Sequence, residues 1–134
     1  MKIIAVTLGE PAGIGPDLGV LLAQKNLSKN IIFIADPDLL QISAKILKKS
    51  IKINILKNIS SKTIAGNKTI NVLPIKLNTK NKPGKLNPKN SAYVLDTIRA
   101  AAELCITGEI GAMVTGPISK SVLNKGGYKI SGHT

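Results

Sequence analysis

The sequence predicts an α/β fold with a mainly parallel sheet flanked by helices. Short apolar runs, which are typical of buried parallel strands, alternate along the 134 residues with segments of helical periodicity. A loop with three glycines, residues 9–17, separates the first apolar run from a helix that Pro16 can begin. Strands that alternate with helices favour a parallel sheet, in which ligands bind beyond the carboxyl ends of the strands.

Five segments are expected to form strands. They lie at residues 2–7, 31–35, 52–56, 69–74 and 112–114. Most are continuously apolar, but 52–56 alternates polar residues with Ile and should be half-exposed. The stretch 76–90 is rich in Lys, Asn, Pro and Gly, which is typical of a surface loop. We do not interpret it as a domain boundary, because no compact unit is complete before it.

Helices are expected at residues 16–24, at 37–48, at 91–107, and from Pro117 to about 126. The first has Leu18, Leu21 and Leu22 toward one side. The second follows Asp36-Pro37, a capping residue and a proline at the first helical position.

The helix at 91–107 has the clearest pattern. Its apolar stripe consists of Val94, Ile98, Ala101 and Cys105. Charged residues lie on the other side, where Arg99 and Glu103 have the i,i+4 spacing of an ion pair. Gly108 is expected to end this helix.

The glycine loop at 9–17 matches neither common phosphate-binding motif. A P-loop needs Lys and then Ser or Thr after its last glycine, but proline and aspartate follow Gly15. The dinucleotide fingerprint needs a glycine where Leu18 stands, although Asp36 lies about 20 residues on, where a ribose-binding acid is expected. Two interpretations stay open: a loop that approaches a ligand, and a connection whose glycines only turn the chain.

Composition indicates an ordered protein of a reducing compartment. Hydrophobic residues make up 43% of the chain, which argues against disorder. The single Cys105 excludes an internal disulfide. The sequence shows neither a signal-peptide pattern nor an apolar run of about 18 residues. We therefore expect a cytoplasmic protein without a membrane partner.

The net charge of +12 allows two interpretations. Twelve lysines lie between Lys45 and Lys89, and no acidic residue lies between Leu39 and Leu95. A nucleic-acid-binding surface would explain this charge, but Arg99 is the single arginine and aromatic stacking residues are missing from the basic stretch. Lys, Asn and Ile share A/T-rich codons, so a coding bias at surface positions is the favoured interpretation. We expect no specific nucleic-acid partner.

Three polar stretches are candidates for a functional site. The glycine loop and residues 115–120 each follow a predicted strand, and residues 131–134 end the sequence. Lys120 lies in the second stretch and His133 in the third. Taken alone, each also has an ordinary interpretation, as a solvated lysine and as a residue of a fraying terminus.

In order and spacing, three motifs resemble the 4-hydroxythreonine-4-phosphate dehydrogenase family of pyridoxine 5′-phosphate biosynthesis. They are Thr7-Leu8-Gly9-Glu10-Pro11-Ala12-Gly13-Ile14-Gly15-Pro16, Thr115-Gly116-Pro117-Ile118-Ser119-Lys120 and Ser131-Gly132-His133-Thr134. The resemblance implies a fold like that of isocitrate and isopropylmalate dehydrogenases. It would make residues 1–134 the amino-terminal part of a two-domain enzyme. Small departures occur at Leu8 and Ser119.

The same resemblance implies oxidation of a phosphorylated hydroxy-amino acid by NAD or NADP, followed by decarboxylation. His133 and Thr134 match the pair that contacts the substrate, and Lys120 lies in a possible active-site loop. Cofactor-binding residues remain unassigned, and the resemblance assigns no catalytic residue to this chain. A divalent metal (Zn, Mg or Co) would be bound by histidines beyond it, in a homodimer, so the isolated chain is expected to be inactive. A non-catalytic remnant and a basic nucleic-acid-binding module are the alternatives.

Overall fold

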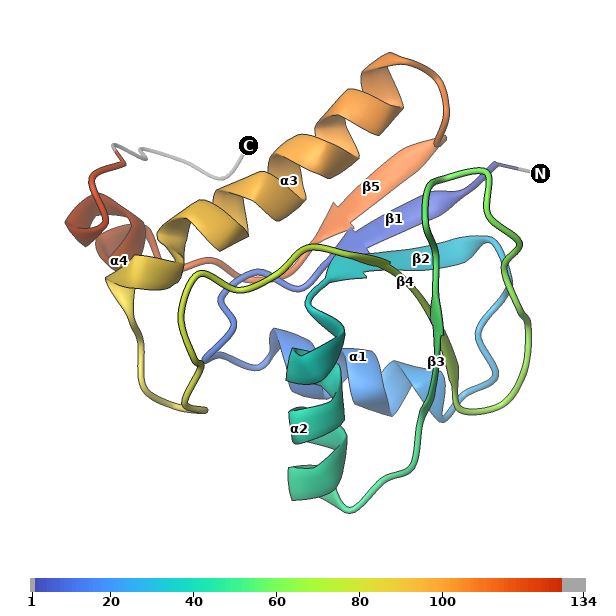
Figure 1. The fold of residues 1–134 in the computed structure, drawn as a ribbon, viewed down its shortest axis with the longest axis horizontal. Helices are drawn as coiled ribbons and strands as arrows, with labels where there is room; N and C mark the ends of the chain where they lie inside the picture. The colour runs from blue at the N-terminus through green and yellow to red at the C-terminus, as the bar shows by residue number, and fades with distance from the viewer. Residues whose placement is uncertain (1, 129–134) are drawn as a thin grey trace.

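The computed structural model describes residues 2–128 and shows a five-stranded parallel sheet (Figure 1). The strands are β1 (Ile4–Thr7), β2 (Ile31–Ala35), β3 (Lys52–Ile55), β4 (Thr69–Pro74) and β5 (Ala112–Thr115). The helices are α1 (Gly15–Ala23), α2 (Pro37–Leu47), α3 (Ser91–Ile106) and α4 (Lys120–Lys125), with a short 3₁₀ helix, η1 (Pro88–Asn90), before α3. The sheet order is β3-β4-β2-β1-β5, and every neighbouring pair is parallel. The predicted α/β class is confirmed.

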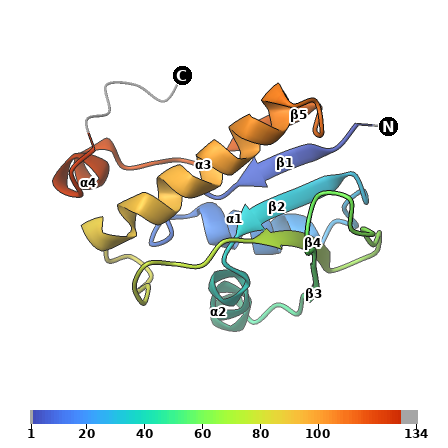
Figure 2. The same ribbon diagram turned by 45° about the horizontal axis from the view of Figure 1, so that its top comes forward.

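Helices cover both faces of the sheet (Figure 2). α1 and α2 pack on one face, where Phe33 of β2 and Val72 of β4 are fully buried. α3 lies across the other face, over Ala5 of β1 and Ile32 and Ile34 of β2. The continuously apolar sequence of β2 follows from burial on both sides, as expected for a parallel sheet. Within residues 2–128, no helix has the length and apolar character needed to cross a membrane.

The leucine side of α1 is exposed to solvent. Leu18, Leu21 and Leu22 are each between 43% and 45% exposed. The helix instead buries a side of small residues, which includes Gly19 and Ala23. A Cβ at Gly19 would lie 3.2 Å from a side-chain carbon of Leu40, so α1 packs closely against α2 through this position. Close approach to α2 therefore determines which side of α1 is buried.

Two local expectations are corrected. Arg99 pairs with Asp96 at 3.6 Å in an i,i+3 arrangement instead of with Glu103. α4 begins at Lys120 and not at Pro117, because the Ser119 side chain accepts a hydrogen bond from the Val122 N–H and acts as the N-cap. A serine cap two residues after the proline thus defines the helix start.

Asp36 joins three parts of the fold. Its Oδ1 accepts the Asp38 N–H at 2.9 Å and caps α2, as the sequence predicts. Its Oδ2 accepts the Leu77 N–H at 2.9 Å, which holds the chain after β4. Its own N–H donates to the Tyr93 hydroxyl of α3 at 3.0 Å. Desolvation by burial, more than the nearby Asp36 carboxylate, raises the pKa of Tyr93 to about 12. Both oxygens of the Asp36 carboxylate are therefore used structurally, and the ribose-binding interpretation is not supported.

We predict that Asp36→Ala lowers the free energy of unfolding by about 2–3 kcal/mol, since it removes the cap of α2 and the part-buried hydrogen bond that the Leu77 N–H donates to Oδ2. Asp38→Ala is the matched control, because Asp38 is exposed in the first turn of the same helix. That control should cost no more than about 1 kcal/mol. Urea denaturation of the three proteins measures the difference, and equal losses would contradict the assigned role.

Candidate functional site

The strand order places a topological switch point between β1 and β5. From β1 the chain moves through α1 to β2 on one side, and it later returns through α3 to β5 on the other side. The two helices lie on opposite faces of the sheet (Figures 1 and 2). Ligands of open α/β sheets bind where the carboxyl ends of two such strands diverge. The glycine loop and the 115–120 turn follow these two strands.

The two loops are joined directly by their backbones. Thr7 pairs in register with Thr115. Just beyond this pair, the Gly116 N–H donates to the Thr7 carbonyl at 2.7 Å and the Glu10 N–H donates to the Pro117 carbonyl at 2.9 Å. Both loops therefore lie at the same edge of the sheet, as expected for segments that each follow a strand of a parallel sheet.

Glycine is needed at this junction because the backbones leave no room for a side chain. A Cβ on Gly9, whose φ is +74°, would lie 2.1 Å from the Pro117 oxygen. A Cβ on Gly116 would lie 2.4 Å from the Leu8 oxygen, and one on Gly15 would lie 1.7 Å from that same oxygen. These three glycines therefore permit close backbone packing within the protein.

Three amides of the glycine loop already have internal hydrogen-bond acceptors. Besides the Glu10 bond to Pro117, the Ala12 N–H donates to Glu10 Oε1 at 3.2 Å and the Gly13 N–H donates to the Glu10 carbonyl at 3.0 Å. A phosphate-binding loop would direct such groups at its ligand. Of the two interpretations of this loop, the structural one accounts for these amides.

Glu10 is the buried ionisable group of the junction. The residue is 7% exposed. Burial raises the pKa of its carboxyl above the ordinary value of 4.5, and the hydrogen bond from Ala12 opposes this shift only in part. The sequence did not single out this residue, since a glutamate inside a glycine-rich loop gives no signal of burial.

The lysine-rich loop, residues 76–90, is anchored to the glycine loop. The Gly84 N–H donates to the Ala12 carbonyl at 2.9 Å, and Asn81 Nδ2 donates to the Pro11 carbonyl at 3.1 Å. A cavity of about 220 Å³ lies between the two loops and the helices α1 and α2. Asp17 and Ser43 line this cavity and are hydrogen-bonded to each other. No sequence signal connects these segments, which are 70 residues apart at the Asn81–Pro11 bond.

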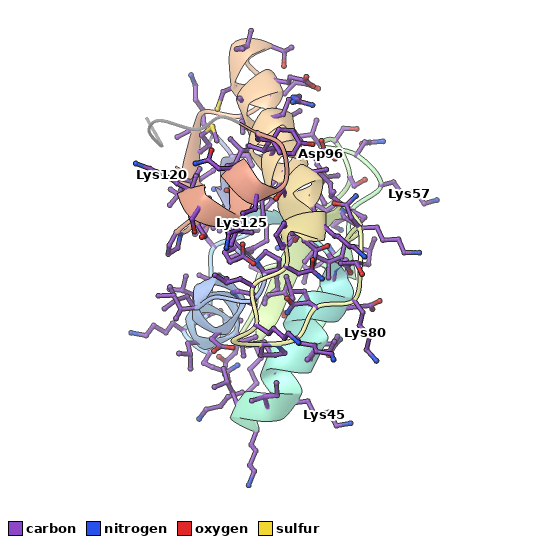
Figure 3. All side chains as sticks on the ribbon, turned by 90° about the vertical axis from the view of Figure 1, so that its left-hand side faces the viewer. Lys45, Lys57, Lys80, Asp96, Lys120 and Lys125 are labelled. Atoms are coloured by element: carbon purple, nitrogen blue, oxygen red, sulfur yellow. The ribbon has the colours of Figure 1, made fainter. Side chains whose placement is uncertain are left out.

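The structure places one of the three predicted site residues. Lys120 is exposed at the start of α4, where the 115–120 turn ends (Figure 3). His133 and Thr134 lie outside the described residues, so their predicted substrate contact stays a prediction. Among residues 2–128, no group of three or more His, Cys, Asp or Glu side chains could hold a metal ion.

Comparison with known proteins gives consistent matches. The family model described as "Pyridoxal phosphate biosynthetic protein PdxA" matches residues 27–134. The chain belongs to the PdxA family. It is 43% identical over 132 residues to the 4-hydroxythreonine-4-phosphate dehydrogenase of Saccharophagus degradans and 41% identical over 133 residues to that of Methylococcus capsulatus. The crystal structure of the dehydrogenase from Burkholderia phymatum superposes with a TM-score of 0.86 at 27% identity.

This PdxA-family chain matches only part of those proteins. The match covers 98% of the chain but 39% of the Saccharophagus relative and 40% of the Methylococcus relative. It likewise covers 99% of the chain and 41% of the Burkholderia structure. The shared region therefore includes the whole parallel sheet described above, and more than half of each relative lies outside it.

We predict that Gly9→Ala destabilises the protein by about 3 kcal/mol or more, because it combines a positive φ with a backbone clash. Gly108→Ala isolates the first effect. Gly108 has a φ of +80°, and a Cβ there would lie in open space. The control should cost about 1–2 kcal/mol. Comparable losses in chemical denaturation would show that the clash is relieved by movement of the 115–120 turn.

Glu10→Gln should change how stability depends on pH. Because the pKa of Glu10 is raised in the folded protein, the ionised carboxylate disfavours folding. The stability that Glu10 provides is present below its unfolded pKa and is lost as pH rises through its folded pKa. The glutamine variant should therefore be more stable than the parent at pH 7, and this advantage should disappear below about pH 4.5. Unfolding curves at both pH values, with Glu103→Gln on the exposed side of α3 as control, measure the effect.

Proposed function

We propose that residues 1–134 form the amino-terminal part of a two-domain, NAD- or NADP-dependent 4-hydroxythreonine-4-phosphate dehydrogenase. The enzyme would act in pyridoxine 5′-phosphate biosynthesis, in the cytoplasm and as a homodimer. The observation that carries this proposal is the 43% identity to the Saccharophagus dehydrogenase across 98% of the chain. The position of the matched loops supports it, because both lie at the switch point of the sheet, where α/β enzymes bind ligands.

The substrate class follows from the names of the relatives. It is a small hydroxy-amino acid that carries a phosphate. Oxidation converts its secondary alcohol to a ketone as a hydride leaves for the nicotinamide and a proton is released. The resulting 3-keto acid then loses carbon dioxide. In this proposal, His133 and Thr134 hold the substrate's polar groups, since imidazole and hydroxyl can each donate and accept hydrogen bonds.

In this proposal, residues 2–128 position the backbone around the site. The junction of the glycine loop with the 115–120 turn fixes the backbone that leads into α4, where Lys120 lies. The metal ligands and most cofactor contacts would come from other parts of the enzyme, because the chain contains a single histidine. A divalent metal would supply stabilisation of the developing alkoxide.

The lysines do not favour a nucleic-acid-binding module. Every lysine within residues 2–128 is exposed. In Figure 3, Lys45, Lys57 and Lys80 project toward the right-hand side of the view, whereas Lys120 of α4 projects toward the left. A nucleic-acid surface gathers its basic residues on one face or along one groove. This spread supports the coding-bias interpretation of the net charge.

A chimera tests the proposed activity. Residues 1–134 replace the matched segment of the Saccharophagus relative, and the product is assayed for NADH or NADPH formation with 4-phosphooxy-threonine and a divalent metal. We expect metal-dependent turnover and release of carbon dioxide. A folded chimera without turnover would support the non-catalytic remnant.

In an active chimera, we predict that His133→Ala reduces kcat/KM for the substrate by about ten- to a hundredfold, the loss expected for one hydrogen bond to a charged group. Metal content and nicotinamide affinity should stay within about twofold, which corresponds to less than about 0.5 kcal/mol. Metal analysis, cofactor titration and steady-state kinetics measure the three quantities separately. Loss of metal with unchanged substrate affinity would identify His133 as a metal ligand and contradict the assignment.

A further inference from the structure

Three lysines of the lysine-rich loop line one hollow. Lys80, Lys82 and Lys85, together with Leu86 and Asn87, surround a volume of about 310 Å³ (Lys80 is labelled in Figure 3). That volume is at the lower end of the range of small-molecule sites, which is about 300–1,000 Å³. These lysines are a local exception to the dispersed lysines of the chain, because they share one concave surface. We call this feature the lysine hollow.

A tight turn positions two of the lysines. The Lys85 N–H donates to the Lys82 carbonyl at 3.0 Å, and the two residues also form an antiparallel bridge. Pro83 and Gly84 occupy the central positions between them, and the φ of +78° at Gly84 is typical of the third residue of a type II turn. Lys82 and Lys85 therefore lie opposite each other at the base of this turn.

The backbone around the hollow is held by hydrogen bonds to other parts of the fold. Before the turn, the Asn78 and Thr79 N–H groups donate to Asn90 Oδ1 at 3.1 and 2.9 Å. Within the turn, the Gly84 N–H donates to the Ala12 carbonyl at 2.9 Å. A loop that is already ordered loses little further conformational freedom when a ligand binds, and this favours affinity.

Within residues 2–128, no carboxylate pairs with the three lysines of the hollow. The sequence contains no acidic residue between Leu39 and Leu95, and the residues that line the hollow include no Asp or Glu. A cleft lined by charges of one sign focuses the electric field and concentrates ions of the opposite sign. The lysine hollow therefore has the electrostatic character of an anion-binding site.

We propose that the lysine hollow binds the phosphate group of a small organic phosphate monoester. Such a group carries a charge of about −1.5 to −2 at pH 7 and offers three acceptor oxygens to the three ammonium groups. Asn87 adds a neutral donor, because its Oδ1 accepts the Lys89 N–H while its Nδ2 can donate. Leu86 is 49% exposed beside the lysines and offers an apolar contact to the organic part of the ligand. This inference goes beyond the proposed function, because it applies whether or not the chain is catalytic.

A nucleic acid is a less suitable occupant of the hollow. Each phosphate of its backbone is a diester with a single negative charge, whereas a monoester carries up to about two. Proteins that bind single strands also stack bases on aromatic side chains. The sequence has no aromatic residue between Lys45 and Lys89. A small phosphate monoester therefore fits the hollow better, and the test includes an oligonucleotide to separate the two.

Titration with phenyl phosphate tests the proposal on the 134-residue chain. Backbone N–H signals are followed by NMR at constant ionic strength and at about pH 7.5, where the monoester is largely a dianion. We expect a saturable change centred on residues 80–87, with a dissociation constant on the order of 1 mM. Lys80→Gln, Lys82→Gln and Lys85→Gln combined should weaken binding by about tenfold or more, because the charge-assisted hydrogen bonds are lost.

A second variant tests the apolar contact. Leu86→Ala should weaken the binding of phenyl phosphate by about threefold, because apolar contact area is lost. Its affinity for inorganic phosphate should stay within about twofold of the parent, because inorganic phosphate has no organic part. An equal loss for both ligands would contradict the contact assigned to Leu86.

The matched control combines Lys25→Gln, Lys45→Gln and Lys57→Gln. It removes the same number of charges from exposed positions that do not line the hollow, so phenyl phosphate should bind within about twofold of the parent. Equal weakening by the two triple variants would show general attraction by the net charge and overturn the proposal. So would the absence of a saturable change at residues 80–87. Tighter binding of a short oligothymidine than of phenyl phosphate at these residues would assign the hollow to nucleic acid instead.

Discussion

The pairing of β1 with β5 is the constraint on which the rest of the candidate site depends. Past this pair, the two chains continue in backbone contact, and no side-chain atom fits between them at Gly9 or Gly116. The position of the 115–120 turn, and with it the start of α4, is thereby fixed relative to the glycine loop. A glycine-rich sequence at a switch point can thus serve the approach of two backbones, without any contact of its amides with phosphate.

Hydrogen bonds from polar side chains hold the loops around this junction in place. Asp36 ties the chain after β4 to α2 and α3, and Asn81 ties the lysine-rich loop to Pro11. A long loop without regular structure would otherwise retain much conformational freedom. Single side chains that bond to backbone groups therefore hold a surface loop beside the sheet edge where ligands of α/β proteins bind.

Local chemistry in the sequence was sufficient to predict the strands and most helix ends, because apolar runs, the Asp36-Pro37 cap and the stripe on α3 are short-range signals. It could not predict which side of α1 is buried, since close packing of Gly19 against Leu40 is a tertiary effect. The burial of Glu10 and the bond from its N–H also depend on a turn more than 100 residues further along the chain. The sequence placed the glycine loop and the 115–120 turn after parallel strands and so at one edge of the sheet, whereas the hydrogen bonds within and between them required the structure.

The acidic residues show how the chain tolerates its large positive charge. Lysines occupy exposed positions throughout residues 2–128, where substitution costs little. Three of the seven acidic residues accept hydrogen bonds at buried or partly buried positions: Glu10 from a loop amide, Asp17 from the Ser43 hydroxyl, and Asp36 as the cap of α2. Drift toward lysine at exposed positions would leave such carboxylates in place, because each satisfies a specific donor that would otherwise lose its partner. The net charge is then carried by exposed side chains, outside the buried residues that form the α/β scaffold.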